Sequence, residues 1–540
     1  MMLYLKRISR LLLFFFFLIS CETSNNSSNQ RKNILIILAD DLGYSDLSSF
    51  GGEINTPNID FLASSGTIFS NFYTSPLCAP SRAMLLSGND NHVAGIGIQA
   101  FSSSNYGYEG ILSDRVAILP EVLNMNGYQT YMVGKWHIGG DPYYRGFDKT
   151  FALLPGAFSH YDNSKPIRGY PDSAFSENGK KRLWDVGKYS SDFYTDKLID
   201  FLDTNDKDPF FAYASFTAPH WPLQVDEIYS NKYKGKYDEG YDVLKMNRFN
   251  SLKDFNIISR ESTFPIFKTE YSSWDKLNDY EKSIESRKME IYAGMIENLD
   301  FNVGRIISFL KENNQYDNTV ILFMSDNGAA GEDFYYNNIY GDYIQENFNY
   351  DYEDMGKPNS FISLGIGWAE AITSPFRLYK GFTTAGGMKS PLIISGVNDN
   401  KISLSNEFLS LLDIAPSIYD LLNIKYPRFL NKKELYSPIG ESIIPYLKSE
   451  SKNIHKDDYV FAFEHSGNSF LKKGEWKIIN TIQPFNLSNF ELYNIKNDIS
   501  EITNKKNINR KIYNDLIDEW NNYSKSRRLI FPTPYIDNLK

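Results

Sequence analysis

Carboxylate side chains follow two apolar runs of strand length in this sequence. Asp40 and Asp41 come directly after the run Asn33 to Ala39, and Asp326 and Asn327 follow a second run of the same kind. Three carboxylates and an amide oxygen form an all-oxygen ligand set, which suits a hard cation such as Ca²⁺ or Mg²⁺. No histidine adjoins these residues and the chain has no cysteine cluster, which disfavours zinc. Each of these two pairs alone would be a common turn sequence. The prediction of a metal site rests on the fact that both pairs follow strands of the buried type.

A second set with chemical potential is the run CAPSRAMLLSG at residues 78–88, which holds one of only two cysteines in the chain. Pro80 suits the first turn of a helix. Cys78 is therefore expected at the positive end of a helix, with Arg82 one turn further on and on the same side. If the other cysteine, Cys21, carries lipid, Cys78 has no disulfide partner. A lone cysteine in an exported protein calls for a chemical explanation, although a chance cysteine at a helix start is the simple alternative.

The N-terminus has the layout of a secretory signal. Three basic residues within positions 1–10 precede an apolar run, Leu11 to Ile19, which is too short to cross a bilayer as a helix. The run ends Leu-Ile-Ser-Cys, which resembles the bacterial lipobox, where the cysteine is lipidated and becomes the first mature residue. We predict a lipoprotein signal peptide over 1–20, a tether over 21–32 and an exported bacterial lipoprotein, periplasmic or at the cell surface, anchored through Cys21. A plain signal peptide with an incidental cysteine is the alternative.

Charge and composition narrow the set of partners. The formal net charge is −10, and removal of residues 1–20, with Lys6, Arg7, Arg10 and no acid, makes it −13. Such a charge argues against nucleic-acid binding and disfavours long polyanions. An anionic substrate must therefore be held by a local cluster of cations. With 38 Tyr and 38 Phe, the chain has aromatic side chains enough to fill a core and also to line a ring-stacking pocket.

Apolar runs alternate with helical patterns along most of the chain. Gln129 to Val133, Phe210 to Ser215 and Val320 to Met324 resemble the run before Asp40, and Ser283 to Asn313 has the spacing of a long amphipathic helix. This alternation predicts an α/β fold with a large, mixed, mostly parallel sheet flanked by helices. In such sheets ligands gather beyond the carboxyl ends of the strands, where unusual polar residues recur here.

The last hundred-odd residues have a different pattern. Short strand candidates and a final helix predict a smaller C-terminal antiparallel sheet plus helix, and we divide the chain into a catalytic domain, 33–430, and a C-terminal α+β subdomain, 431–540. Residues 333–365 form a polar and aromatic segment without clean periodicity, which is either a functional loop or a disordered insertion. The predicted C-terminal elements are Tyr459 to Glu464, Ser469 to Leu471, Trp476 to Asn480, Glu491 to Tyr493 and the helix Lys511 to Tyr523.

The run Cys-x-Pro-Ser-Arg followed by Leu-x-Ser-Gly resembles the sulfatase family, in which the cysteine is oxidised enzymatically to formylglycine. The resemblance covers about residues 33–525 and is closest to the bacterial arylsulfatase branch. It implies an alkaline-phosphatase-like fold and hydrolysis of sulfate monoesters, either aryl sulfates or sulfated carbohydrates, after maturation by a formylglycine-generating enzyme. Further blocks in family order are Asp40-Asp41-Leu42-Gly43, Gly134-Lys135-Trp136-His137, Arg145-Gly146-Phe147-Asp148, Pro219-His220-Trp221-Pro222, Ser325-Asp326-Asn327-Gly328, Trp368-Ala369-Glu370-Ala371, Lys380-Gly381 and Leu492-Tyr493-Asn494.

The same resemblance implies the chemistry. A hydrated formylglycine offers one gem-diol oxygen as the nucleophile toward sulfur, and its second hydroxyl then expels sulfate by breaking a C–O bond, which regenerates the aldehyde. One Ca²⁺ per active site would lower the pKa of the diol and orient it. By resemblance, its ligands are Asp40, Asp41, Asp326, Asn327 and residue 78.

Roles for the remaining site residues also follow from the resemblance. Arg82 would hold and activate the hydrated aldehyde, and Lys135 and Lys380 would bind sulfate oxygens and offset charge in the transition state. His137 would be the base that collapses the hemiacetal, and His220 the substrate-binding acid that protonates the leaving oxygen.

Two features fit the family less well. His92 could reach the substrate or merely cap a turn, and we include it among the substrate-binding candidates. The family usually has Glu-Gly-Gly-x-Arg-x-Pro after the second lysine, whereas this chain has Ala385 and Lys389 at the Glu and Arg positions. Lys389 keeps the charge without the bidentate fork, and the missing carboxylate puts the local support of Lys380 in doubt.

Other functions on the same pattern are a zinc-dependent phosphate ester hydrolase, a formylglycine phosphonate hydrolase and a surface-anchored, non-catalytic binder of sulfated glycans. The first typically uses Ser or Thr with two zinc ions and more histidine ligands. The second would be separated by relative turnover of aryl sulfate and phosphate diester. The third is disfavoured because every predicted catalytic position holds a residue that can act in catalysis.

Overall fold

The computed structural model describes the chain from residue 31 to residue 531 with short gaps. The predicted signal peptide, Cys21 and nearly all of the tether lie outside the described residues. From Lys32 onward the chain forms one compact unit. Among the described helices, none is both long enough and apolar enough to cross a membrane. The described ranges are 31–99, 101–161, 174–183, 187–205, 208–267, 271–336, 340–397 and 402–531.

A ten-stranded sheet forms the centre of the molecule, in the order β11-β2-β10-β9-β1-β8-β4-β5-β6-β7. Its middle is parallel: β1 (Asn33–Ala39) lies between β9 (Thr319–Ser325) and β8 (Phe210–Ser215), and β8 pairs with β4 (Gln129–Lys135). The predicted mixed, mostly parallel sheet is thereby confirmed. The flanking strands are β2 (Gly66–Phe69), β5 (Lys149–Leu153), β6 (Phe175–Glu177), β7 (Lys180–Arg182), β10 (Leu392–Ser395) and β11 (Leu404–Ser405).

Helices cover both faces of this sheet, which explains the continuous apolar runs. Every residue of β1 is buried, and alternate side chains enter different cores. Leu35 and Ile37 pack in one core with α1 (Pro57–Ser64), α4 (Ser190–Asp203) and α7 (Asp279–Glu312). The opposite face is covered in the same way. Ile34 and Ile36 pack with α2 (Cys78–Ser87), α3 (Leu119–Met125) and α11 (Ile414–Leu421).

The long helix α7 begins four residues before the predicted start at Ser283. A capping box explains the difference: the Asn278 side chain accepts from the Glu281 N–H, and the Glu281 carboxylate accepts from the Asn278 N–H. Two otherwise unpaired donors at the helix start are satisfied in this way. The apolar spacing alone does not reveal this polar first turn.

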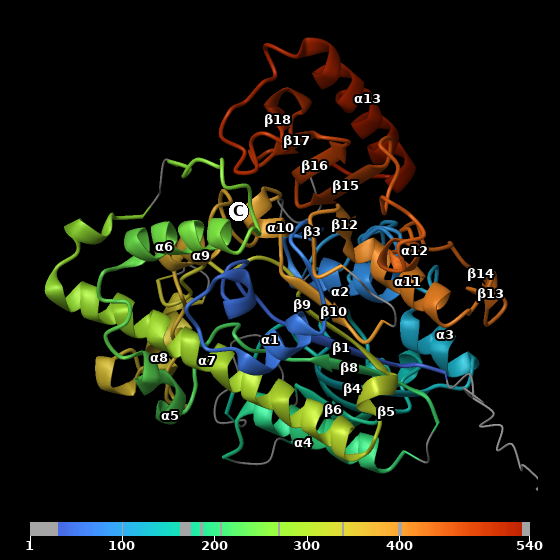
Figure 1. Ribbon diagram of the computed structural model, residues 1–540, viewed down its shortest axis with the longest axis horizontal. Coiled ribbons are helices and arrows are strands. Elements are labelled where there is room, and N and C mark those ends of the chain that lie inside the picture. Colours follow the sequence, from blue (N-terminus) through green and yellow to red (C-terminus); the bar gives the residue numbers. More distant parts are fainter. Residues whose placement is uncertain are drawn as a thin grey trace, which may run out of the picture. The chain divides into compact units, whose positions relative to one another are not determined.

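The C-terminal part forms a four-stranded antiparallel sheet with α13 (Arg510–Arg527) packed on it, drawn in red at the top of Figure 1. Each predicted strand and the final helix is present, with ends that differ by no more than a few residues. The division at 430 stays a prediction, and a small hairpin, β13 (Phe429–Leu430) with β14 (Lys433–Glu434), spans it. The four strands are β15 (Val460–His465), β16 (Asn468–Lys473), β17 (Trp476–Asn480) and β18 (Glu491–Asn494).

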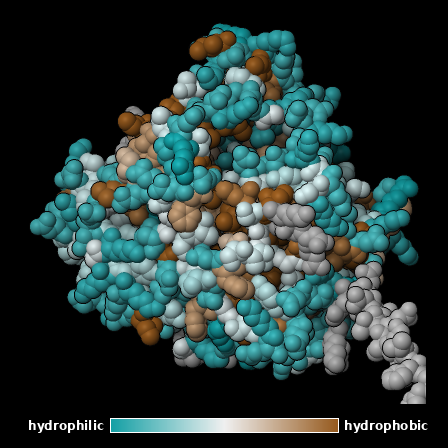
Figure 2. Space-filling model, in the orientation of Figure 1, coloured by the Kyte–Doolittle hydropathy of each residue, from teal (hydrophilic) through white to brown (hydrophobic). Residues whose placement is uncertain are grey.

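The described part of segment 333–365 is packed. It contains α8 (Gly341–Asn347), and its apolar side chains Ile344, Phe348 and Phe361 gather in a small core. Phe334 contacts the ring of Trp221, with centroids 4.4 Å apart. This segment therefore lies against the residue that follows His220. In the orientation of Figure 2 the visible surface is mostly hydrophilic, with apolar residues in small patches.

Candidate active site

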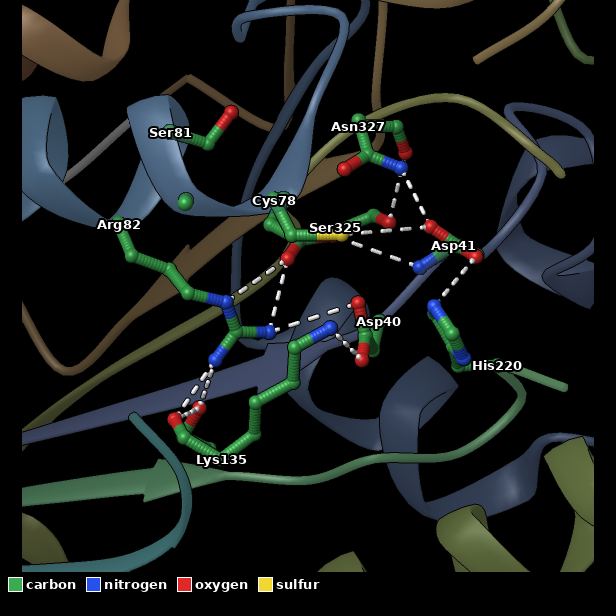
Figure 3. A network of polar contacts seen from close by, with 12 residues as sticks. Asp40, Asp41, Cys78, Ser81, Arg82, Lys135, His220, Ser325 and Asn327 are labelled. Carbon is green, nitrogen blue, oxygen red and sulfur yellow. Dashed lines mark hydrogen bonds and ion pairs between the residues drawn. The ribbon is translucent and has the colours of Figure 1, made fainter. Parts of the chain in front are cut away.

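The carboxyl ends of the four central strands bring the predicted site residues together. Asp40 and Asp41 follow β1, Asp326 and Asn327 follow β9, and Lys135 is the last residue of β4. Because these strands are parallel neighbours, their ends meet at one edge of the sheet. Figure 3 shows the N-terminus of α2 directed at the same place, with Cys78 and Arg82 facing the carboxylates.

Two of the strand-end residues adopt left-handed backbone conformations. Asp41 has φ 66° and His137 has φ 61°, values that non-glycine residues rarely adopt. The first is held by long-range contacts: the N–H of Asp41 lies 3.4 Å from Asp326 Oδ1, and that of Leu42 donates to Ser325 Oγ at 3.0 Å. Such strained residues concentrate at functional sites. The turn after β1 is thus locked to the end of β9.

Cys78 is the first residue of α2 and is completely buried. Its Sγ lies 3.8 Å from Asp41 Oδ1. Burial raises the pKa of the thiol well above its ordinary value, although Lys135 and Lys380 act in the opposite direction. The predicted helix and the placement of Cys78 at its positive end are confirmed.

Arg82 connects three strand ends through its guanidinium. Nε and Nη2 donate to Asp326 Oδ2 at 3.0 and 2.8 Å, and Nη1 donates to the Lys135 carbonyl at 2.7 Å. Nη2 also lies 3.5 Å from Asp40 Oδ1. Nη1 also donates to Ser215 Oγ, at the end of β8, at 2.5 Å. Burial works against the charge, but the nearby acids outweigh it and raise the pKa of Arg82. The side chain is a permanent cation with a fixed direction.

Lysines pair with the other two carboxylates. Lys135 Nζ lies 2.6 Å from Asp40 Oδ2, and Lys380 Nζ lies 2.7 Å from Asp41 Oδ2. Burial opposes the charged form of Lys380, but Asp41 and other anionic groups raise its pKa well above the ordinary value. Asp40, Asp41 and Asp326 are thus paired with Lys135, Lys380 and Arg82. This pairing offsets the cost of burying six charges together.

The cluster has the features expected of a metal site. Asp40, Asp41, Cys78 and His220 each offer one ligand atom, and these atoms lie within 4.8 Å of one another. Asp40 Oδ1 and Asn327 Oδ1 are buried acceptors that make no hydrogen bond among the described residues, although Arg82 Nη2 lies 3.5 Å from the first. Buried oxygens left without donors are costly unless something else binds them. A hard cation such as Ca²⁺ fits this donor set.

One detail differs from the predicted ligand set. Asp326 is absent from the group of four, and Arg82 donates to its Oδ2. His220 belongs to the group, with Nε2 3.5 Å from Asp41 Oδ2. Asn327 turns its amide nitrogen toward Asp41 Oδ1 at 2.6 Å. Arg82, Lys135 and Lys380 thus bind several of the carboxylate oxygens that a metal ion would use as ligands.

The two imidazoles at the strand ends have a shared electrostatic environment. Burial, followed by Lys380 and Lys135, lowers the pKa of His220 well below its ordinary value. Burial, followed by Lys135 and Arg82, does the same for His137. His220 Nδ1 lies 2.7 Å from the Trp221 carbonyl, whereas His137 Nδ1 is buried and has no partner among the described residues. Both shifts favour the neutral form of the rings.

His92 differs from the other predicted residues, since none of its contacts in the described chain joins it to this cluster. The ring is fully buried, with Nε2 2.9 Å from Glu464 Oε2 and Nδ1 3.4 Å from Asp90 Oδ1. Tyr108 packs edge-on against it. Both ring nitrogens face carboxylates from outside the site, so a substrate-binding role for His92 has no geometric support.

Several residues of the site were not among the sequence candidates. Ser215 binds Arg82, and Tyr292 of α7 places its hydroxyl 3.3 Å from the Asp41 carbonyl. Glu332 is a further acid whose charge acts on Asp41 and Lys380. Ser215 could have been found as the one polar residue that ends a buried apolar strand. The others come from segments whose positions depend on tertiary packing.

The departure at Ala385 has a compensating contact. Ala385 begins the short helix α10 (Ala385–Met388), and its N–H donates to Glu501 Oε2 at 3.0 Å. The other oxygen of Glu501 binds Lys477 Nζ at 2.8 Å, with both side chains fully buried. A carboxylate therefore does support this segment, but it comes from the loop between β18 and α13. Lys380 itself is held by its backbone bond to Ala329 and by Asp41.

The fold and the strand-end site together define a hydrolase of the alkaline-phosphatase-like class. The family model described as Sulfatase matches residues 32–424. The chain therefore belongs to the sulfatase family, and it is a sulfuric ester hydrolase, as its sequence predicts.

Relatives of the chain support this placement. It is 40% identical over 511 residues to a protein of Schizosaccharomyces pombe described as an uncharacterized sulfatase, covering 90% of this chain and 92% of the relative. It is 35% identical over 423 residues to the arylsulfatase of Klebsiella aerogenes, covering 76% and 90%. The crystal structure of Ps i-CgsB in complex with k-i-k-neocarrahexaose superposes with a TM-score of 0.64 at 26% identity, covering 92% and 93%. The resemblance to the bacterial arylsulfatase branch is supported by the second of these.

Proposed function

We propose that residue 78, oxidised to formylglycine, is the nucleophile of sulfate-ester hydrolysis, and that Asp40, Asp41, Asp326 and Asn327 hold one Ca²⁺ beside it. The observation that carries this proposal is the pair of buried oxygens on Asp40 and Asn327 that make no hydrogen bond within the described chain, in a cluster where Asp40, Asp41 and Cys78 have ligand atoms within 4.8 Å of one another. When present, the hydrated aldehyde supplies a hydroxyl nucleophile and the cation lowers the pKa of that hydroxyl.

The cations of the cluster serve the sulfate group. Lys135 and Lys380 lie 2.6 and 2.7 Å from the Asp40 and Asp41 carboxylates, and the charges of both act on the thiol of Cys78. We assign them to the sulfate oxygens, whose negative charge they offset in the transition state. Arg82 is held by Asp326 and Ser215 and orients the hydroxyl groups on residue 78.

The histidines move the protons. His220 Nδ1–H donates a hydrogen bond to the Trp221 carbonyl, which fixes the ring. Nε2 is directed at Asp41 and can pass a proton to the leaving oxygen once the ring has taken one up, which a bound sulfate favours by offsetting the charges of Lys380 and Lys135. His137 has a free ring nitrogen and a lowered pKa, properties that suit a base for the later C–O cleavage.

A sulfated carbohydrate is the substrate class that we favour. A cavity of about 420 Å³ includes Gly331, four positions after Asn327, in its wall. Five tyrosines line it, and two of them, Tyr280 and Tyr336, are 65% and 68% exposed. Aromatic faces that remain open to solvent suit stacking on a sugar ring. The other tyrosines of this cavity are Tyr241, Tyr271 and Tyr350.

Two measurements test these assignments. Desulfation of a panel of sulfated mono- and oligosaccharides, beside a chromogenic aryl sulfate, should show carbohydrate substrates turned over with the higher kcat/KM. Turnover of the aryl sulfate alone would contradict the carbohydrate assignment without affecting the catalytic one. Removal of calcium with a chelator should lower the rate by at least about 10³-fold, since a metal ion contributes several kcal/mol to such reactions, and added Ca²⁺ should restore it.

Export and maturation complete the proposal. Lipid attachment at Cys21 would tether the enzyme to a membrane, and Cys21→Ala should then release active enzyme into the soluble fraction; unchanged membrane attachment would argue against the lipobox. Because Cys78 is fully buried in the folded chain, the formylglycine-generating enzyme must act before folding. A chain refolded without that enzyme should keep its thiol and remain inactive even when the maturation enzyme is added afterwards.

A further inference from the structure

Three lysines are buried where the C-terminal sheet meets the region around β3 (Phe72–Tyr73) and α10, which lie below that sheet in Figure 1. Lys389 directly follows α10, Lys472 belongs to β16 and Lys477 to β17. Lys477 is paired, since its Nζ lies 2.8 Å from Glu501 Oε1. The other two have no carboxylate within 4.0 Å among the described residues. Among the described residues, only one of these three buried lysines therefore has a carboxylate partner.

Aromatic rings take the place of counter-ions. Lys389 is 9% exposed, and its Nζ lies 4.8 Å from the ring centre of Phe376 and 5.4 Å from that of Tyr73. Lys472 is 8% exposed, and its Nζ lies 4.0 Å from the ring centre of Phe408. The negative face of a ring attracts a cation, but it offsets only part of the hydration that a buried ammonium loses.

Both lysines line the same cavity, which has a volume of about 610 Å³. The acids of its wall lie elsewhere: Glu261 and Glu475 are exposed, and Asp498 accepts backbone N–H groups of the loop that follows it. Neither ammonium lies within 4.0 Å of any of them. No residue of this wall belongs to the strand-end cluster, so the cavity is separate from the catalytic groups.

The electrostatics favour an anion in this cavity. Burial, followed by the charge of Lys477, lowers the pKa of Lys389 to about 7 and that of Lys472 to about 8. Glu501 acts on Lys389 and Glu407 on Lys472 in the opposite direction, but among the described residues neither ammonium has a carboxylate within 4.0 Å. A bound anion would therefore stabilise their charged forms. Ammonium groups donate charge-assisted hydrogen bonds to oxyanions.

We propose that this cavity is a second anion-binding site, in which Lys389 and Lys472 together hold a sulfate group. The group is either inorganic sulfate, the product of the established reaction, or a sulfate ester on another sugar of a substrate chain. Both sources present the same tetrahedral oxyanion to the two lysines.

Equilibrium dialysis of the full-length enzyme with radiolabelled inorganic sulfate tests the first source. The wild type should bind one sulfate at the catalytic cluster and a second in the cavity. The double variant Lys389→Met/Lys472→Met should lose the second, with affinity there lower by at least about tenfold, a change that corresponds to loss of one good charged contact. Lys496→Met is the matched control, because this lysine is exposed at the wall of the same cavity.

Steady-state kinetics test the second source. If the site holds an ester of the substrate chain, the double variant should raise KM for a sulfated oligosaccharide by at least about fivefold, with kcat unchanged and with no effect on a sulfated monosaccharide. Thermal unfolding of the double variant should be unchanged or shifted upward, because two buried amines without carboxylate partners are removed. The proposal is overturned if the folded double variant keeps both the sulfate stoichiometry and the oligosaccharide KM of the wild type.

Discussion

Two buried histidines of this enzyme lie beside carboxylates and yet have opposite properties. His220, in the strand-end cluster, has a pKa well below its ordinary value because it is buried and faces Lys380 and Lys135. His92 is equally buried, but the hydrogen bonds and charges of Asp90 and Glu464 outweigh burial and raise its pKa to about 9. The contrast lies in the sign of the surrounding charge.

The surroundings of His92 and the strand-end cluster also differ in how many buried polar atoms make no hydrogen bond. Around His92 the Glu464 carboxylate is shared, with Oε1 accepting the Gly467 N–H and Oε2 binding the imidazole. At the strand ends, Asp40 Oδ1, Asn327 Oδ1 and His137 Nδ1 lack hydrogen-bond partners among the described residues. His92 Nδ1 also makes no hydrogen bond among the described residues, but Asp90 Oδ1 faces it at 3.4 Å. A buried ion pair of this kind holds two parts of the chain together, whereas several unsatisfied acceptor atoms in one place indicate a site for a ligand. Three substitutions test this contrast, in order of decreasing effect on turnover.

Cys78→Ala should have the largest effect. We expect turnover of any sulfate ester to fall by at least about 10⁴-fold, as for loss of other covalent nucleophiles. The fold should remain, because alanine fits the space of the thiol and such a truncation costs on the order of 1 kcal/mol. Initial rates and thermal unfolding measure the two effects. Cys21→Ala is the control for loss of a cysteine, and it should leave the rate of the solubilised enzyme unchanged.

Mass spectrometry of the peptide that contains residue 78 sharpens this test. Active wild-type enzyme should carry the aldehyde in place of the thiol. Full activity in a preparation whose residue 78 is still a cysteine would refute the nucleophile assignment, whatever the variant does.

His220→Gln should have the next largest effect, and its size should depend on the leaving group. Loss of a general acid costs about 10²-fold or more where the leaving oxygen needs a proton. A sugar alcohol needs that proton far more than a nitrophenol, so the ratio of the two rates should change. Rates on a sulfated sugar and on nitrophenyl sulfate measure it. Equal losses on both substrates would show that His220 only positions its neighbours.

The positions of the strand-end residues were predictable because the cause is local. A run such as Asn33 to Ala39 is apolar on both faces only in a sheet covered on both sides, and both ends of β1 and β8 were predicted correctly. Parallel neighbours then bring Asp40 and Asp326 to one edge without further information. The predicted α2 likewise begins where Cys78 meets the cluster.

The features that could not be predicted from the sequence depend on contacts between residues far apart in the chain. His92 meets Glu464 across 372 positions, and Ala385 meets Glu501 across 116. Neither partner stands out in the sequence, because a single glutamate in a strand or loop is usually solvated. The substrate-binding assignment of His92 lost its support for that reason, since its locked ion pair becomes visible only once the C-terminal sheet is placed.

His92→Gln should have the smallest effect on turnover and a large effect on stability. Removing one partner of a buried ion pair leaves Glu464 unpaired, which costs about 3–5 kcal/mol, while kcat/KM of the folded enzyme should change by less than about threefold. Because the folded-state pKa of His92 is raised to about 9, its contribution is fully present below the unfolded pKa of about 6.5. The contribution is lost as the pH rises through 9. Denaturant unfolding of wild type and variant at pH 6 and pH 10 should therefore show a difference that shrinks at the higher pH. A difference that is equal at both pH values would mean that His92 contributes packing and not charge, and a large loss of kcat/KM in the folded variant would return it to the active site.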